Sequence, residues 1–469
     1  SAGTNRVVRF LRHLPDEGWR PSVLTAKARG PAAVPDDVRV ARATVPWPHP
    51  LLGGGRRSAV VNRWLAVPDA YSAWILPAVL KGRRILARER FDALFSSSPR
   101  PSVHVVAAVL SEHADLPWLA DYRDPWSTYQ FRRFPTPAHR RAHFGLEAWA
   151  LQRAAAITAV NRPILDDLVA RHPWLTGQAH VLPNGFDRTE EPEKAALDDG
   201  FWIVHTGRLY GREQQVAAFL EALAAQPPDV KALFVGVDES RVRPDAARLG
   251  LGDRVRVEPL VPLPVALGYQ RAADALLLVN GRRPESMSSK VFEYLQSGRP
   301  VFAISPTGSA ARTLFSEVGG ATCVLPDAPM AEPLAAFVAA VRAGETMPAA
   351  QPALARYDMS RLTADLAAIL DGLTAFRSEY SGAIWMEVFV VPGVNDRPEA
   401  MARVAAAARR VAPDRIQLNT AVRPAADPSV RPVPPERLAE LAAVFGAGAE
   451  IIARGAALAS RPYRPTADA

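Results

Sequence analysis

Short apolar runs alternate with helix-like stretches along most of the chain, and one unit shows the pattern fully. The apolar run Ala275–Val279 predicts a buried strand, and a polar loop follows it. The next segment predicts a helix that ends before Gly298, because glycine commonly follows the last helical turn and Pro300 cannot continue the helix. A second apolar run, residues 301–305, predicts another strand. Strand, loop, helix and strand form a βαβ unit, in which ligands bind at the carboxyl ends of the strands.

The same alternation recurs on both sides of this unit. Further strand-like runs lie within residues 91–99, 116–122, 155–161, 181–187, 201–206, 232–236 and 255–261. A charged, proline-containing stretch, residues 188–200, separates these runs into two groups and predicts a linker. The pattern therefore predicts an α/β protein.

Charged side chains gather in the loop and at the helix start of the βαβ unit. Glu285 and Glu293 stand eight positions apart, with Lys290 between them. Ser288 or Ser289 would cap the helix, so that free amide groups and the positive end of the helix dipole face an anion. Lys290 and Glu293 share a helix face, where they would contact the phosphate and the sugar of one nucleotide. The alternative is a solvated helix start with an ordinary salt bridge.

Residues 285–294, with the Leu-Gln-Ser-Gly-Arg-Pro that follows, resemble the retaining glycosyltransferases of the GT-B fold (the family 4 type), which share an E-x7-E motif. The resemblance covers most of residues 1–370 and implies two Rossmann-like, doubly wound domains, residues 1–190 and 191–370, that face a cleft. It also implies transfer of a sugar from a nucleotide diphosphate sugar to a hydroxyl acceptor, with retention at the anomeric carbon. By the same resemblance, Glu293 would accept hydrogen bonds from the ribose hydroxyls. Glu285 would bind the transferred sugar or steady positive charge at its anomeric carbon.

The second domain opens with the apolar run 201–206, which leads into Gly207 and Arg208. The resemblance implies that Gly207 lies beside the donor, that Arg208 joins Lys290 on its diphosphate, and that Arg212 is the second basic residue there. Arginine suits this role because its planar fork matches phosphate oxygens in pairs. These cations would stabilise the leaving diphosphate, so neither a metal ion nor a cofactor is expected. The alternative for Arg208 is a plain surface charge.

The start of the chain resembles the opening of the same family: a glycine-containing loop, a first helix and a second strand. In that family a strand precedes the loop, so the resemblance implies that the chain is truncated at its start. Gly3 is the residue expected near the donor phosphates. A flexible terminus is the alternative.

A second polar loop follows the strand-like run 116–122 and contains Arg123 and Asp124. In the family this loop lies on the acceptor side of the cleft, and many members carry His-Asp where this chain has Arg-Asp. The two residues are therefore candidates for the catalytic contact with the sugar from the N-terminal side. The alternative is an Arg–Asp pair that holds the loop.

The last part of the chain, residues 371–469, follows a different pattern. Residues 382–396 and 413–424 resemble the later strands of radical SAM proteins related to the wyosine-synthesising tRNA enzymes. The resemblance implies a partial β/α barrel without the C-x3-C-x2-C segment that holds the iron–sulfur cluster. Cys323 is the only cysteine, and such a cluster requires three thiolates, so no Fe–S cofactor is expected.

Composition bounds the partners. The net charge is +8 and the pI is about 9.8, yet only five of the 56 basic residues are lysines, which indicates a compositional bias toward arginine and no nucleic-acid partner. No apolar run approaches the roughly 18 residues of a membrane span. Because many members of the resembled family act on lipid-linked acceptors, a basic face in contact with an anionic membrane remains open. The single cysteine fits a reducing cytoplasm, with or without peripheral attachment to the inner face of the membrane.

These observations favour a cytoplasmic glycosyltransferase whose partners are a nucleotide-sugar donor and a glycan or lipid-linked acceptor. The alternative is an inactive or binding-only GT-B fragment fused to a radical SAM remnant. A third interpretation takes the last part as primary, as a fragment of an iron–sulfur enzyme acting on RNA, but the missing cysteines argue against it. Donor sugar, base and acceptor stay open.

Overall fold

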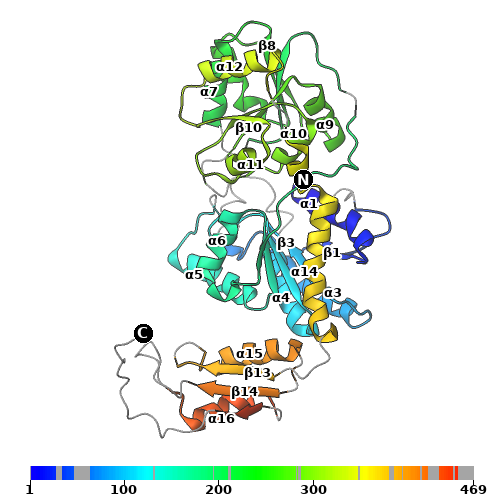
Figure 1. Ribbon diagram of the computed structural model, residues 1–469, viewed down its shortest axis with the longest axis vertical. Helices are drawn as coiled ribbons and strands as arrows, with labels where there is room; N and C mark the ends of the chain where they lie inside the picture. Colours follow the sequence, from blue (N-terminus) through cyan, green and yellow to red (C-terminus); the bar gives the residue numbers. More distant parts are fainter. Residues whose placement is uncertain are drawn as a thin grey trace, which may run out of the picture.

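The computed structural model describes residues 2–27, 34–46, 64–129, 132–193, 195–209, 213–280, 283, 287–346, 349–379, 385–392, 395–411, 413, 415–420, 432–446 and 449–452. In Figure 1 three groups of strands follow one another along the long axis of the molecule, coloured green, then blue to cyan, then orange to red. Among the described residues, no helix combines the length and the apolar character needed to cross a membrane.

The N-terminal domain is built on parallel strands. Its described strands form a two-stranded and a four-stranded sheet: β1 (Ser22–Ala26) beside β2 (Arg39–Ala43), and, in spatial order, β3 (Leu94–Ser97), β4 (Trp118–Tyr122), β5 (Ala156–Ala159) and β6 (Ala179–Val181). Its helices are α1 (Ala2–His13), α3 (Ile75–Leu86), α4 (Ser102–Ala114), α5 (Pro137–Leu151) and α6 (Arg162–Arg171). Every residue of β4 is buried, as expected for a parallel strand that is covered on both faces.

The second domain holds one six-stranded parallel sheet. Its strands are β7 (Phe201–Thr206), β8 (Val230–Val235), β9 (Val255–Glu258), β10 (Ala275–Val279), β11 (Val301–Ile304) and β12 (Ala321–Val324). Its helices are α7 (Glu213–Ala224), α8 (Arg243–Arg248), α9 (Leu263–Ala272), α10 (Lys290–Ser297), α11 (Ala310–Val318), α12 (Ala331–Arg342) and α13 (Gln351–Ala355).

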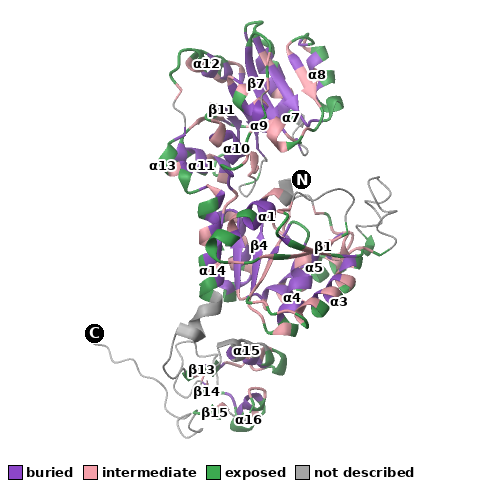
Figure 2. Ribbon diagram, turned by 90° about the vertical axis from the view of Figure 1, so that its right-hand side faces the viewer, coloured by how far each residue is buried: buried purple, intermediate pink, exposed green. Residues whose placement is uncertain are grey.

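The strand order of this sheet is β12-β11-β10-β7-β8-β9. This is the doubly wound order, and the direction of winding reverses between β7 and β10. In such sheets ligands bind at the carboxyl ends of the two strands that flank the reversal. In Figure 2 the strands of the two larger domains are mostly purple, because helices cover both of their faces. The predicted α/β fold with Rossmann-like, parallel sheets is confirmed.

A long helix returns the chain from the second domain to the first. Helix α14 (Met359–Glu379) runs beside α1 (Figure 1), and Leu366 is fully buried in a cluster shared with Phe10 and Leu119. The Trp19 Nε1 donates a hydrogen bond to Asp371 Oδ1 (3.0 Å). Residues 359–370, expected to belong to the second domain, therefore pack on the first, and the helix continues past the expected boundary at residue 370.

The last part of the chain forms a small β/α module. Parallel strands β13 (Trp385–Val390), β14 (Arg415–Thr420) and β15 (Ala449–Ile451) make a three-stranded sheet, with α15 (Pro398–Val411) and α16 (Pro435–Ala443) between them in the chain. Val390, Met401 and Leu418 are fully buried in a core that this module builds from its own residues. The resemblance to a radical SAM barrel stays a prediction.

Candidate functional site

The turn after β7 brings together three residues expected at the donor. Gly207 has a φ of +82°, a left-handed conformation that favours glycine, and a Cβ atom added there would lie 2.9 Å from the Lys290 Cε, so the lysine side chain would have to shift. The Lys290 Nζ lies 3.1 Å from His205 Nε2 and 3.4 Å from the carbonyl oxygen of Arg208. The Arg208 side chain is exposed. The ammonium group therefore lies over the turn after β7 and connects this turn to α10, the helix after β10.

Helix α10 is held against this turn by hydrogen bonds from its own side chains. The Tyr294 hydroxyl accepts a hydrogen bond from the Thr206 backbone N–H (2.9 Å), and burial raises the pKa of Tyr294 to about 12. The helix starts at Lys290 and ends before Gly298, whose φ of 75° is left-handed, as the glycine pattern predicts. Ser289 precedes the helix, but its side chain caps no helical amide, so the expected serine cap is wrong for this residue.

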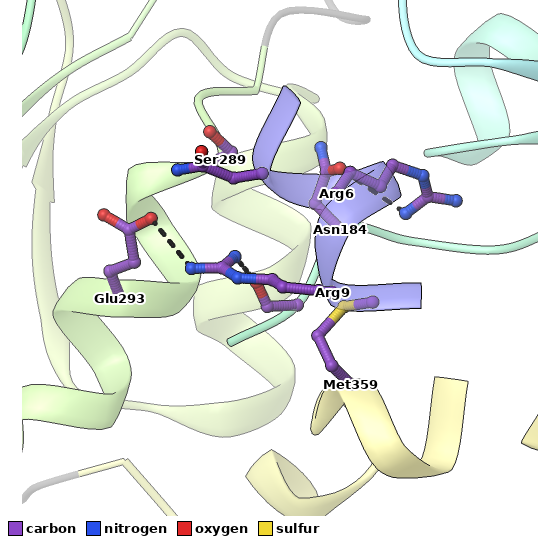
Figure 3. A pocket seen from close by; sticks show the side chains of 8 residues that line it. Arg6, Arg9, Asn184, Ser289, Glu293 and Met359 are labelled. Atoms are coloured by element: carbon purple, nitrogen blue, oxygen red, sulfur yellow. Dashed lines mark hydrogen bonds and ion pairs between the residues drawn. The ribbon is translucent and has the colours of Figure 1, made fainter. Parts of the chain in front are cut away.

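One turn into the same helix, Glu293 faces the N-terminal domain (Figure 3). Its side chain is 11% exposed, and its Oε1 lies 3.4 Å from the Nη2 of Arg9 on α1. Burial raises the pKa of Glu293, and the charge of Arg9 opposes that rise. A small pocket opens between the domains here, lined by Asn5, Arg6, Arg9, Asn184, Gly185, Ser289, Glu293 and Met359.

The sequence patterns did not single out Arg9, which is 3% exposed. It donates to both carboxylate oxygens of Glu190 (2.9 and 2.6 Å) and to the carbonyl oxygen of Gly185 (2.8 Å). The available signal was the spacing of Arg6, Arg9 and Arg12, which repeats every three residues and so follows one side of a helix. A basic side of a helix is ordinarily solvated, and here acidic groups from β4, from the segment after β6 and from α10 pair with it.

Arg6, another lining residue, fixes α1 to the carboxyl end of β4. Its guanidinium makes two 3.0 Å hydrogen bonds to Asp121, which is fully buried, and it also donates to the carbonyl oxygens of Leu182 and Pro183. Ser97 and Thr158 donate to the same carboxylate (2.6 and 2.8 Å). Burial alone would raise the pKa of Asp121, but the charge of Arg6 and these hydrogen bonds lower it.

Arg123 and Asp124 follow β4 as predicted but do not line the pocket of Figure 3. The Arg123 Nε donates to the carbonyl oxygen of Ser98, a contact that ties the two loops after β3 and β4 together. Burial raises the pKa of Asp124, and the charge of Arg123 lowers it. This geometry favours the loop-holding role for Arg123, and the catalytic role of the pair stays a prediction.

The other expected site residues divide into two groups. Glu285 and Arg212 lie outside the described residues. Gly3 belongs to the first turn of α1, whereas a loop was expected there.

Within the described part of the chain, no three His, Cys, Asp or Glu side chains are arranged to hold a metal ion. Cys323 is partly buried in β12, and burial raises the pKa of its thiol.

Comparison with known proteins gives a domain assignment and a fold. Residues 3–190 match the family described as Glycosyltransferase Family 4. HepE from Anabaena, solved in complex with UDP, is 17% identical, with a TM-score of 0.57 over 79% of this chain and 96% of that one. Sucrose-phosphate synthase from Thermosynechococcus elongatus is 16% identical, with a TM-score of 0.51 over 78% and 88%. A glycosyltransferase from Rickettsia africae is 13% identical, with a TM-score of 0.52 over 79% and 93%.

A curated protein, the GTPase Obg of Brachyspira hyodysenteriae, is 29% identical over 87 residues. That match covers 19% of this chain, and the chain spans 13% of the length of that relative, so it carries no functional assignment. The domain match and the structural likeness over 79% of the chain agree with each other. The fold is GT-B, and the N-terminal domain matches a family of glycosyltransferases.

Proposed function

We propose that the chain transfers a sugar from a nucleoside diphosphate sugar to a hydroxyl group of a glycan or lipid-linked acceptor, with retention at the anomeric carbon. In this reaction the bond between the anomeric carbon and the diphosphate oxygen breaks, and the diphosphate leaves with the electron pair. The acceptor oxygen forms the new bond and releases its proton. The nucleoside diphosphate is the product that gains negative charge, so the site requires fixed positive charge beside it.

The observation that carries this proposal is the position of Lys290. Its ammonium group lies over the Gly207 turn, at the point of the doubly wound sheet where ligands bind. Arg208 is the residue after Gly207; its side chain is exposed and would supply a second cation to the diphosphate. HepE, which shares the fold, has been solved in complex with UDP and glucose, which makes UDP and UDP-glucose suitable probes.

The remaining roles extend from this point. Glu293 lies one turn beyond Lys290 and would accept hydrogen bonds from the ribose. Glu285 would contact the transferred sugar, and Asp124 with Arg123 would lie on the acceptor side. The pocket between Glu293 and α1 supports a nucleotide that touches both domains.

Calorimetric titration with UDP tests the proposal. We expect Lys290→Ala to weaken binding by about 1.5–3 kcal/mol, the range for hydrogen bonds to charged groups. Lys231→Ala is the matched control, because Lys231 belongs to the same sheet but pairs with Asp198 near the amino end of β8. Unchanged affinity in a folded Lys290→Ala variant would remove this lysine from the site and overturn the proposal.

A further inference from the structure

Arg9 joins three segments that are far apart in the chain. Its guanidinium lies between the loop at Gly185, the linker residue Glu190 and Glu293 of α10. The Glu190 contact is bidentate and short (2.9 and 2.6 Å), whereas the Glu293 contact is single and longer (3.4 Å). The linker therefore fixes the guanidinium, and the guanidinium in turn meets the carboxylate of the second domain.

Glu293 is the residue that this contact affects. An ionised carboxylate can accept hydrogen bonds from both ribose hydroxyls, because it has only acceptor sites. A protonated carboxyl group has one O–H donor and therefore fewer acceptor sites for the ribose. Burial and the charge of Glu190 raise the pKa of Glu293, while Arg9 and Lys290 lower it. Arg271 of α9 lines a second small pocket on another side of the same carboxylate.

We propose that Arg9 is a positioning residue for the donor: held by Glu190, it orients the Glu293 carboxylate and keeps it ionised for the ribose. Because Arg9 belongs to the N-terminal domain and Glu293 to the second, nucleotide affinity then depends on the contact between the domains. The inference rests on the proposed function, since it assigns a helper to the ribose contact of that site.

The test compares Arg9→Met with Arg12→Met. Arg12 lies on the same helix and contacts Glu190 at 3.4 Å and Asp187 at 3.1 Å. The Arg12→Met variant therefore also removes a cation from Glu190, but it leaves the contact between Arg9 and Glu293 in place. Each variant is titrated with UDP and with 2′,3′-dideoxy-UDP, which lacks the ribose hydroxyls. A loss of ribose contacts changes the ratio of the two affinities, whereas a general loosening of the fold weakens both ligands together.

We expect Arg9→Met to bind UDP about tenfold more weakly, as for one lost hydrogen bond to a charged group. Its preference for UDP over the dideoxy analogue should fall toward that of Glu293→Gln. The pH below which UDP binding is lost should also move upward, because Glu293 protonates more readily without the cation. Arg12→Met should keep the preference and the pH profile of the wild type.

If Arg9→Met does not fold, Arg9→Lys decides the matter. Lysine keeps the charge but not the planar fork, so the pH profile should stay close to wild type while the preference for UDP falls. An Arg9 variant that folds and retains both the preference and the pH profile would overturn this inference. The proposed function would still stand in that case, provided that the wild type binds UDP and that Lys290→Ala weakens this binding. A wild type that binds no nucleoside diphosphate would overturn both.

Discussion

At the scale of single residues, the described site separates charges that hold the fold from charges that face a ligand. Arg6 and Asp121 form a buried ion pair inside the N-terminal domain, and neighbouring groups complete the hydrogen bonds of both side chains. Lys290 and Glu293 instead lie beside the turn after β7 and the pocket between the domains. Spacing in the sequence predicted the second pair because both residues share one helix. It could not predict Arg9, because its partners come from positions more than 170 residues away.

The Arg6–Asp121 pair gives a prediction about stability. We expect Arg6→Met to lower the free energy of unfolding by about 3–5 kcal/mol at pH 7, because it leaves a buried carboxylate without its cation. Arg162→Met is the control, since Arg162 pairs with Asp166 at the surface (75% and 55% exposed) and should cost less than about 1 kcal/mol. Urea unfolding of the three proteins measures both values.

The same pair sets the sign of a pH effect. The folded-state pKa of Asp121 is lowered, so its contribution to stability is fully present above the unfolded pKa of about 3.9 and is lost as the pH falls through the folded pKa. In Arg6→Met, burial would instead raise that pKa, and protonation would relieve the unpaired charge. The difference in unfolding free energy between wild type and variant should therefore shrink from pH 7 to pH 4.5. A constant difference would contradict this account.

At the scale of elements, apolar runs predicted most strands because parallel strands buried on both faces contain few polar residues. The run at residues 275–279 matches β10, and the glycine at 298 marks the end of α10. Helix α14 (Met359–Glu379) instead continues past residue 370, where the second domain was expected to end. Local patterns do not say which domain a helix packs against, since that depends on the apolar surface left open by distant segments.

Helix α14 therefore carries an element-scale prediction. Leu366 is fully buried against the N-terminal domain, so Leu366→Ala should destabilise that domain by about 2–5 kcal/mol, the usual cost for a buried leucine. Arg361→Ala on the same helix is the control, because that side chain is 68% exposed and should change stability by less than about 0.5 kcal/mol. Equal thermal unfolding of the two variants would show that α14 does not belong to the N-terminal core.

At the scale of the whole molecule, the two-domain GT-B arrangement followed from the resemblance, and the contact between the domains did not. The sequence motifs assign candidate site residues to each domain separately and do not say which of them meet. The bridge from Glu190 through Arg9 to Glu293 exists only after the linker and both domains have packed. The GT-B fold and the closeness of Lys290 to the turn after β7 could thus be predicted, whereas the contacts on the N-terminal side of the pocket required the structure.

The last prediction concerns the module that follows α14. Because β13, β14, α15 and α16 build their own core, a chain that ends at Glu379 should fold and bind UDP with the affinity of the full chain.

A chain that ends at Leu370 keeps Leu366 and Leu370 but loses the Trp19–Asp371 hydrogen bond and the end of α14, so it should unfold at a lower temperature. A chain that ends at Tyr357 lacks α14 entirely and exposes Phe10 and Leu119, so it should not fold. Calorimetry with UDP and thermal unfolding compare the three shortened chains with the full one. Loss of UDP binding on removal of residues 380–469 alone would make the module an integral part of the donor site.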